Sequence, residues 1–508
     1  MRTVRIGIAM VSAIGLVGVA QVHSAASATP SHSRQGEGQW VLSRGAWTAS
    51  RDATIGLKLD AHRVMWLGGL GTSDPVDILR TSIYDIRTQQ FQETAPVPAA
   101  KTATNGAPGA LPLAFAGAGV LADGSVVLAG GEVSPDDPVE TAASRLTYRY
   151  DPRSDRWTRT GDLPVPQEWV GTPSVLLRDG RLLMVAGRGV DEKAVNDTSR
   201  DAFVYNPRRW STVDVVDPAT GTPTGERARV RGRWDFTRTQ DGSLSQLSEG
   251  HYFGSAVQLR DGRVLVTGGH THWNNDVSVL STHTDFFAPT TGVWTQGPSL
   301  PTVPAEDGAL TNSHGGRTNG VCVAALADGK VVIAGGGTQD DGTPYFTTLA
   351  TRQSILVLTP AREPRRSHFE LAPTKIPSGQ GSGAYFGDDG RNNLLCYAIS
   401  RHQVMIAGGQ NNAGEDLFDG YIFDTRASGV RRGPDLVHAV APWAGDPAFG
   451  YPAGFQAPEI STREVSMRDS LLVFPHNVLV SGGGYANFAP ALAGSPHVEQ
   501  LTCAGTDT

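Results

Sequence analysis

The feature that most constrains this 508-residue chain is a hairpin pattern that returns along its length. In each copy an apolar strand runs into an Asp-Gly turn, and a second apolar strand ends in Gly-Gly. The clearest copies span residues 116–131, 255–269 and 322–336. Asp-Gly between alternating apolar runs is a strong hairpin signal, and a type I′ turn, with positive φ at both central residues, is expected. The pattern predicts an all-β protein made of repeated sheets.

Weaker copies complete a set of seven units, at residues 64–69, 182–187, 404–409 and 478–483. Several units continue with an aromatic strand, a turn and a tryptophan, as in Tyr148 to Trp157 and Phe286 to Trp294. These segments supply a third and a fourth strand. Four strands in each of seven units predict a seven-bladed β-propeller.

The last unit lacks its fourth strand. It ends with an apolar segment at residues 498–503, and residues 39–42 near the other end of the chain offer the missing strand. Pairing of Trp40 to Leu42 with residues 498–503 would close the ring and remove an exposed sheet edge. We therefore expect a linker at residues 29–38 and one propeller domain at residues 39–508.

The first 28 residues have the pattern of a signal peptide. Arg2 and Arg5 precede an apolar stretch at residues 6–20, and Ala26 to Ala28 fit a cleavage site. The apolar stretch is too short for a membrane span. We expect a secreted, extracellular protein without a membrane span. Its three cysteines leave at least one thiol without a partner within the chain, so no disulfide framework is expected.

Charge argues against a nucleic-acid partner, because the net charge is −7 and no basic stripe carries interleaved aromatic residues. The basic run at residues 227–233 is interpreted as a solvated strand edge. It belongs to residues 211–249, where the blade pattern lapses. A long interruption of this kind is usually functional or disordered, and a lid over one face of the ring is the functional interpretation.

The repeats resemble kelch propellers, and the Leu-x-Asp-Gly-Arg-Val form of residues 259–264 resembles the propeller of the galactose oxidase family. That resemblance implies a copper site with a Tyr-His pair, a Cys-Tyr cross-link and a histidine from a trailing domain. Cys322 stands where the cross-linked cysteine would be, but the chain has no Tyr-His dipeptide, and Asn393 lies near the expected tyrosine. No segment for a trailing domain follows the seventh unit. We therefore expect no thioether at Cys322, which is interpreted as a small buried hydrophobic residue, and no tyrosyl-radical chemistry.

In such propellers the loops before the inner strands and after Gly-Gly open on one face. Four histidines of two neighbouring units fall in these loops: His251, His270, His272 and His314. Converging imidazoles could bind copper or zinc. They could instead act as general acids or bases, or simply bond backbone carbonyls of the loops.

Further polar and aromatic residues are predicted on the same face. The candidate catalytic residues are His251, Tyr252, Glu168, Arg317 and Glu464. The candidate ligand-binding residues are Asp52, Trp169, Trp273, Tyr385 and Arg463. Such a ring could hold a polar ligand by bidentate hydrogen bonds, or could form an ion-pair network that solvates the mouth of the ring.

Two functions remain open from the sequence. One is a secreted monomeric enzyme or small-ligand-binding protein for a small polar or sugar-like molecule, with a metal at the histidines. The alternative is a non-catalytic extracellular module that binds a glycan or a protein. A propeller fold hosts both kinds of function.

Overall fold

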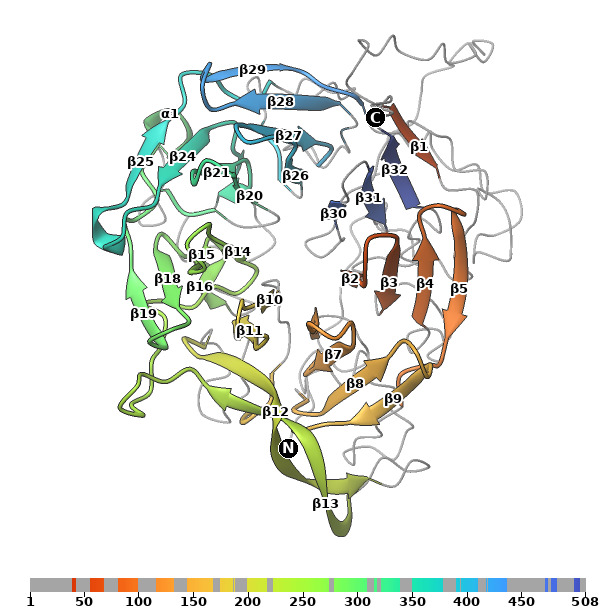
Figure 1. Cartoon of the computed structure of the whole chain (residues 1–508). Helices are drawn as coiled ribbons and strands as arrows, with labels where there is room; N and C mark the ends of the chain where they lie inside the picture. Colours follow the sequence, from red (N-terminus) through yellow and green to blue (C-terminus); the bar gives the residue numbers. More distant parts are fainter. Residues whose placement is uncertain are drawn as a thin grey trace, which may run out of the picture.

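The chain forms a β-propeller in a computed structural model (Figure 1). The residues that the structure describes are 39–42, 55–67, 81–98, 116–131, 144–167, 174–185, 187, 199–216, 223–273, 278–307, 315–317, 321–338, 350–377, 390–392, 394–409, 417, 419–435, 471–473, 477–481 and 498–502. The expected signal peptide and linker lie outside them. Among the described helices, none is long and apolar enough to cross a membrane.

The described strands form seven four-stranded antiparallel sheets, the blades of the ring. Blade 1 contains β2 (Ile55–Lys58), β3 (Arg63–Leu67), β4 (Thr81–Asp85) and β5 (Gln90–Thr94). Blade 2 contains β6 (Gly117–Val120), β7 (Val126–Ala129), β8 (Thr147–Asp151) and β9 (Arg156–Arg159). Blade 3 contains β10 (Val175–Leu176), β11 (Leu182–Val185), β12 (Ala202–Val216) and β13 (Pro223–Phe236). Blade 4 contains β14 (Ser255–Gln258), β15 (Val264–Thr267), β18 (Thr284–Ala288) and β19 (Val293–Gln296).

Blade 5 contains β20 (Cys322–Ala325), β21 (Val331–Ala334), β24 (Ile355–Thr359) and β25 (His368–Leu371). Blade 6 contains β26 (Leu395–Ala398), β27 (Gln403–Ala407), β28 (Gly420–Asp424) and β29 (Gly429–Arg432). Two short ribbons extend blades 4 and 5: β16 (His270–Trp273) with β17 (Ser278–Leu280), and β22 (Gly337–Thr338) with β23 (Ala350–Thr351). The helical turns are α1 (Pro304–Asp307) and η2 (Pro364–Arg366).

Blade 7 joins strands from both ends of the chain. β30 (Leu471–Val473), β31 (Asn477–Ser481) and β32 (Val498–Thr502) are followed in the sheet by β1 (Gln39–Leu42). β1 is antiparallel to β32, with Trp40 opposite Leu501 and Val41 opposite Gln500. The innermost strand β30 lies next to both β26 and β2, so blade 7 stands between blades 6 and 1. The sequence predicts this pairing of residues 40–42 with residues 498–503.

The core lies between the blades, where the second strands and the first residues of the third strands of blades 1 to 6 are largely buried. Every residue of β7, β11, β15 and β21 is buried, as expected for strands covered on both faces. The third and fourth strands of several blades share a tilted aromatic pair, such as Tyr150–Trp157 and Phe287–Trp294, with ring centroids 5.1 and 4.9 Å apart. The Trp157 indole also donates to Ala95 O of blade 1, at 2.9 Å, and so links two blades.

The Asp-Gly turns have a geometry different from the expected type I′ turn. Only the glycine has positive φ, as at Gly124 (82°) and Gly262 (92°), and no aspartate of these turns does. In blade 2 the amide of Gly124 donates to Leu121 O, and the amide of Leu121 donates to Ser125 O. Three residues therefore lie between the bonded residues Leu121 and Ser125, in the type I turn plus left-handed glycine that is the next common hairpin. The Asp123 side chain accepts from the Ser125 amide at 3.1 Å, which explains the aspartate.

The Gly-Gly segments end the second strands for a steric reason. Gly268 and Gly269 have φ of 71° and 85°, and a Cβ on Gly269 would lie 2.3 Å from Tyr252 O. At this point the chain passes close to the loop before the inner strand of the same blade. Only a residue without a side chain fits there.

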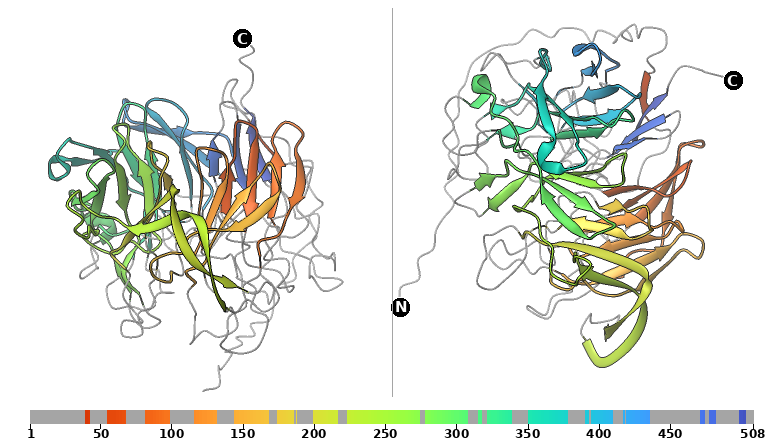
Figure 2. Two further views of the ribbon diagram at one scale, coloured as in Figure 1. Left: turned by 60° about the horizontal axis from the view of Figure 1, so that its bottom comes forward. Right: turned by 60° about the vertical axis from the view of Figure 1, so that its left-hand side comes forward.

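The interruption after Trp210 is not a lid. Residues 202–216 and 223–236 form one long hairpin, because the outer strands of blade 3 extend past the other strands of their sheet. Figures 1 and 2 show this hairpin on the rim of the ring, beside blade 2, and not over the middle of the ring. Its inner face packs on the neighbouring blade, where the Thr160 hydroxyl donates to Arg231 O at 2.6 Å.

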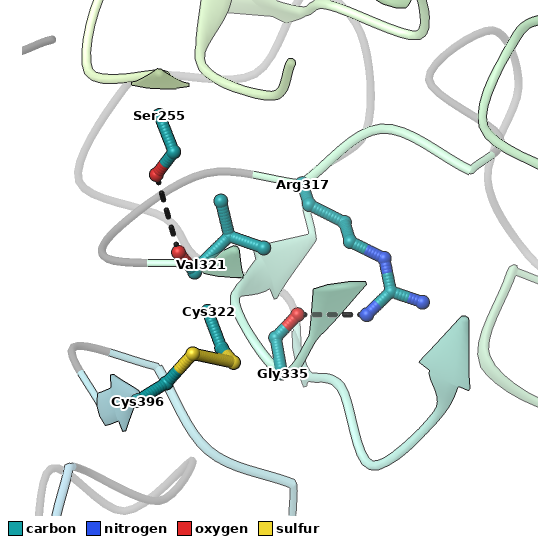
Figure 3. The surroundings of a disulfide bond; sticks show 6 residues. All are labelled: Ser255, Arg317, Val321, Cys322, Gly335 and Cys396. Atoms are coloured by element: carbon teal, nitrogen blue, oxygen red, sulfur yellow. Dashed lines mark hydrogen bonds between the residues drawn. A yellow bond between two sulfur atoms is a disulfide. The ribbon is translucent and has the colours of Figure 1, made fainter. Parts of the chain in front are cut away.

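A disulfide joins the inner strands of blades 5 and 6. Cys322 of β20 and Cys396 of β26 are bonded, with their Cα atoms 5.3 Å apart (Figure 3). The interpretation of Cys322 as a simple buried hydrophobic residue is therefore incomplete, although the residue is buried. The sequence contains no local sign of this bond, because the two cysteines are 74 residues apart and meet only when blade 6 packs on blade 5.

Candidate functional site

The residue four or five positions before the inner strand has the same structural role in blades 4, 5 and 6. His251, Arg317 and Arg391 occupy this position, and all three side chains are fully buried. Each bonds the carbonyl of the first glycine of its own Gly-Gly segment: His251 Nδ1 to Gly268 O at 2.9 Å, Arg317 to Gly335 O at 2.8 Å and Arg391 to Gly408 O at 3.1 Å. The Arg317 bond is drawn in Figure 3. We call these three residues the latch residues.

Each latch residue also bonds the start of the third strand. Arg317 donates to Ser354 Oγ at 2.6 Å and Arg391 donates to Asp419 Oδ1 at 2.6 Å. A buried cation is stable only when such partners compensate for its lost hydration. The latch residues therefore fasten the beginning of the inner strand to the rest of the blade.

In blade 4 the latch is a buried His-Asp pair. His251 Nε2 lies 3.0 Å from Asp285 Oδ2, and both side chains are excluded from solvent. Gly268 O and the Asp285 carboxylate therefore occupy both ring nitrogens of His251. Burial opposes ionisation of Asp285, but the hydrogen bond and charge of His251, with bonds from Ser248, hold its pKa below the ordinary value. His251 thus has neither ring nitrogen available for a metal.

A polar cluster lies on this latch and reaches solvent. Ser248 donates its hydroxyl to Asp285 Oδ2 at 2.8 Å, and its oxygen lies 3.0 Å from His283 Nδ1. Glu249 Oε1 lies 3.0 Å from the same nitrogen, and Ser281 donates to Glu249 Oε2 at 2.9 Å. The side chains of His283 and Glu249 are 26% and 23% exposed, in contrast to the buried pair beneath them. We call Ser248, Glu249, Ser281 and His283 the blade 4 cluster.

The other two described candidates of this blade pair through their backbones. Tyr252 N donates to His270 O at 3.1 Å and His270 N donates to Tyr252 O at 2.7 Å, with both side chains buried. Their ring centroids lie 5.9 Å apart. Burial lowers the pKa of His270 to about 3, so its imidazole is neutral at any physiological pH.

The described donors do not fit a copper or zinc centre. Among the described residues no group of three or more His, Cys, Asp or Glu side chains could hold a metal ion. Both nitrogens of His251 are used, and the Cys322 sulfur is in a disulfide. We therefore derive no step through a metal.

Most of the remaining predicted site residues lie outside the described residues. These are Asp52, Glu168, Trp169, His314, Tyr385, Arg463 and Glu464. The backbones of His272 and Trp273 form β16, next to β17, while their side chains are not described. The structure thus describes the side chains of His251, Tyr252, His270 and Arg317, all of them buried.

The opposite end of the ring has a different chemistry. A hollow of about 600 Å³ there is lined by Gln258–Arg260, Ala325–Ala327 and Ala398–Arg401, at the ends of the inner strands of blades 4 to 6. This lining contains two arginines but neither a carboxylate nor an imidazole. The blade 4 cluster is therefore the better candidate for acid-base chemistry.

Sequence reasoning missed the central residue of this cluster. His283 precedes the third strand, and only the loops before inner strands and after Gly-Gly were assigned to this face. The chain returns to the same face when it enters the third strand, because β15 and β18 are antiparallel neighbours. A histidine placed one or two residues before a third strand was the available signal.

Comparison with known proteins finds a similar fold but no similar sequence. No family model matches the chain, and no curated protein matches its sequence. Among solved structures, the chain is similar to a novel fungal alcohol oxidase with catalytic diversity among the AA5 family, in complex with copper. The two are 12% identical with a TM-score of 0.53, and the match covers 92% of this chain and 76% of the oxidase. This likeness shows that the two proteins share a propeller fold.

Proposed function

We propose that this protein is exported and binds a small hydroxyl-bearing, sugar-like molecule at the face of the ring where the inner strands begin. His283 of the blade 4 cluster contacts the ligand. The observation that carries the proposal is the one-sided bonding of this imidazole. Its Nδ1 faces both Glu249 and Ser248, whereas its Nε2 has no hydrogen-bond partner among the described residues.

This arrangement orients the imidazole for a ligand hydroxyl. Ser248 gives its own proton to Asp285, so Nδ1–H of His283 donates to Ser248 Oγ, with the Glu249 carboxylate equally close, at 3.0 Å. In the neutral form of the ring Nε2 then carries the lone pair and accepts a hydrogen bond from a ligand hydroxyl. The Glu249 carboxylate beside Nδ1 holds the ring in this orientation and makes Nε2 a stronger hydrogen-bond acceptor. Ser248 lies against the same ring nitrogen as Glu249 and is itself held by Asp285, at 2.8 Å. The cluster is therefore a preorganised acceptor.

The shared fold supports a small alcohol-bearing ligand, because the fungal neighbour is an alcohol oxidase. Oxidation itself is not part of the proposal, since the described donors do not form a copper site. A copper or zinc ion held by the undescribed side chains of His272 and His314 would appear in elemental analysis of the purified protein. A stoichiometric metal would add a redox or Lewis-acid role to the same face.

The proposal is tested by titrating the protein with galactose, glycerol and a panel of other sugars and polyols, using calorimetry. His283→Asn keeps a donor toward Glu249 but removes the atom that faces the ligand. We expect it to weaken binding at least about tenfold, the effect of losing one good hydrogen bond. His368→Asn, a change of an exposed histidine on blade 5, is the matched control and should bind as the wild type does.

Two results would contradict the proposal. One is that no compound of the panel binds. The other is that His283→Asn binds a ligand as tightly as the wild type does. The second result would favour the alternative of a glycan- or protein-binding module that uses another surface.

A further inference from the structure

The hairpin β12–β13 presents a charged and aromatic surface that the proposed function does not use. Alternate residues of the two strands point to the same side, and the paired positions Trp210–Arg231, Thr212–Arg229 and Asp214–Arg227 share the outer face. All six of these side chains are exposed, and Trp210 is 47% exposed. We call this outer face the arginine face.

The inner face of the same hairpin is anchored. Val213 and Trp234 are buried, and the Tyr205 ring packs on Trp234 with centroids 5.2 Å apart. Thr160 of blade 2 contacts both the Arg231 carbonyl and the Tyr205 hydroxyl, each at 2.6 Å. The outer face is therefore held in place before any partner arrives, which lowers the entropic cost of binding.

Positive charge dominates the hairpin. Its two strands contain six arginines and three carboxylates, in a chain whose net charge is −7. Asp214 pairs with Arg227 at 3.5 Å, and Asp235 pairs with Arg233. Among the described residues no carboxylate pairs with Arg229 or Arg231. Their guanidinium groups instead lie over the Trp210 ring, 4.7 and 5.6 Å from its centroid.

The spacing of the arginines suits a linear polyanion. Residues two apart on a strand are about 6.8 Å apart, so the side chains of Arg227, Arg229 and Arg231 leave one face of β13 in a row. Guanidinium binds carboxylate and sulfate groups in a bidentate manner. The exposed Trp210 adds an apolar surface beside that row, on which a sugar ring can pack.

We propose that the arginine face binds an anionic polysaccharide, one whose sugar rings carry carboxylate or sulfate groups. Arg229 and Arg231 bind the anionic groups, and the exposed part of Trp210 packs against a neighbouring sugar ring. A polysaccharide fits better than a nucleic acid, because only one aromatic side chain is present and stacking along a single strand needs several. Export, which the sequence predicts, would bring the chain to such polymers. This site is remote from the blade 4 cluster, so the two proposals stand or fall separately.

The test is binding to polygalacturonate and to dextran sulfate, with neutral dextran and single-stranded DNA as comparison polymers. We expect the wild-type protein to bind at least one of the two anionic polysaccharides, with an affinity that falls as salt rises, and not to bind dextran. Arg229→Gln with Arg231→Gln should weaken that binding about tenfold or more. The matched control, Arg87→Gln with Arg426→Gln, removes two exposed arginines from other blades and should have little effect.

Trp210→Ala separates a sugar site from a general polyanion surface. We expect it to weaken polysaccharide binding severalfold and to leave any weak DNA binding unchanged. Unchanged thermal unfolding of each variant would show that the fold is intact. The proposal is overturned if the double arginine variant binds like the wild type. It is also overturned if DNA binds as tightly as the polysaccharides and Trp210→Ala alters neither.

Discussion

At the scale of single residues, a buried polar side chain is defined by its partners rather than by its type. His251 and Arg317 have the composition and position of site residues, but each is bonded to a Gly-Gly carbonyl and to the third strand of its own blade. His283 lies on top of such a latch and is partly exposed. The distinction between latch and site therefore depends on contacts between segments about 30 residues apart.

The buried imidazole of His270 makes a residue-scale prediction about acid stability. Its pKa is about 3 in the folded protein and near 6.5 when unfolded, so the unfolded state gains a proton as pH falls below 6.5 and the folded state does not. The contribution of His270 to the free energy of unfolding is therefore fully present above about pH 6.5, and it decreases as the pH falls below that value. Between pH 7 and pH 5 the loss should be about 2 kcal/mol.

Replacement by a residue that cannot titrate isolates this effect. We expect the difference in unfolding free energy between His270→Phe and the wild type, from urea titrations at pH 7, 6 and 5, to shift toward the variant as pH falls. A difference that stays constant over this range would show that His270 is not kept neutral by burial.

At the scale of elements, the disulfide ties together two strands that share no hydrogen bonds within a sheet. β20 and β26 are inner strands of adjacent blades, and the bond closes a span of 74 residues. By the chain-entropy model a cross-link of this length stabilises the folded state by about 4 kcal/mol. Cys396→Ser should therefore lower the urea midpoint of unfolding clearly, and a reducing agent should do the same to the wild type.

The third cysteine provides the control for that experiment. With Cys322 and Cys396 bonded, Cys503 has no partner left within the chain, so Cys503→Ser should not change the midpoint. Thiol counting on the denatured protein should give one free thiol before reduction and three after it. Three free thiols without reductant would contradict the bond.

At the scale of the whole molecule, the two ends of the chain meet in blade 7. β1 pairs with β32 alone, and β30 at the other side of the sheet faces its neighbours in blades 6 and 1. Without β1, the edge of β32 would present free backbone groups, which destabilise a sheet and promote aggregation.

A pair of proline variants tests the contribution of this strand. Val41 and Leu42 are adjacent in β1, so their N–H groups point to opposite sides and only one of them bonds β32. We expect one of Val41→Pro and Leu42→Pro to cost about 1 to 3 kcal/mol more than the other, through the lost bond and its unpaired carbonyl. Thermal unfolding of both variants measures this difference, and equal, negligible effects would contradict a structural role for β1.

The blades are determined by the sequence itself, because their signals are local. An Asp-Gly turn and a Gly-Gly exit act within about fifteen residues, so the strand positions follow from reading the chain. The pairing of residues 40–42 with residues 498–503 was predicted on another ground, the missing fourth strand of the last unit. The predicted type I′ turn was wrong. The loop is a type I turn followed by glycine, in which the aspartate caps the turn and only the glycine has positive φ.

The site was decided by tertiary structure. Gly268 and Asp285 occupy both ring nitrogens of His251, and His283 is oriented by Ser248 and Glu249. No spacing rule on one loop contains these contacts. The disulfide and the anchoring of the long hairpin arose in the same way, from blades packing on their neighbours. A short-range pattern encodes a repeated sheet, whereas the chemistry of a propeller face depends on side chains that only the packed blades bring together.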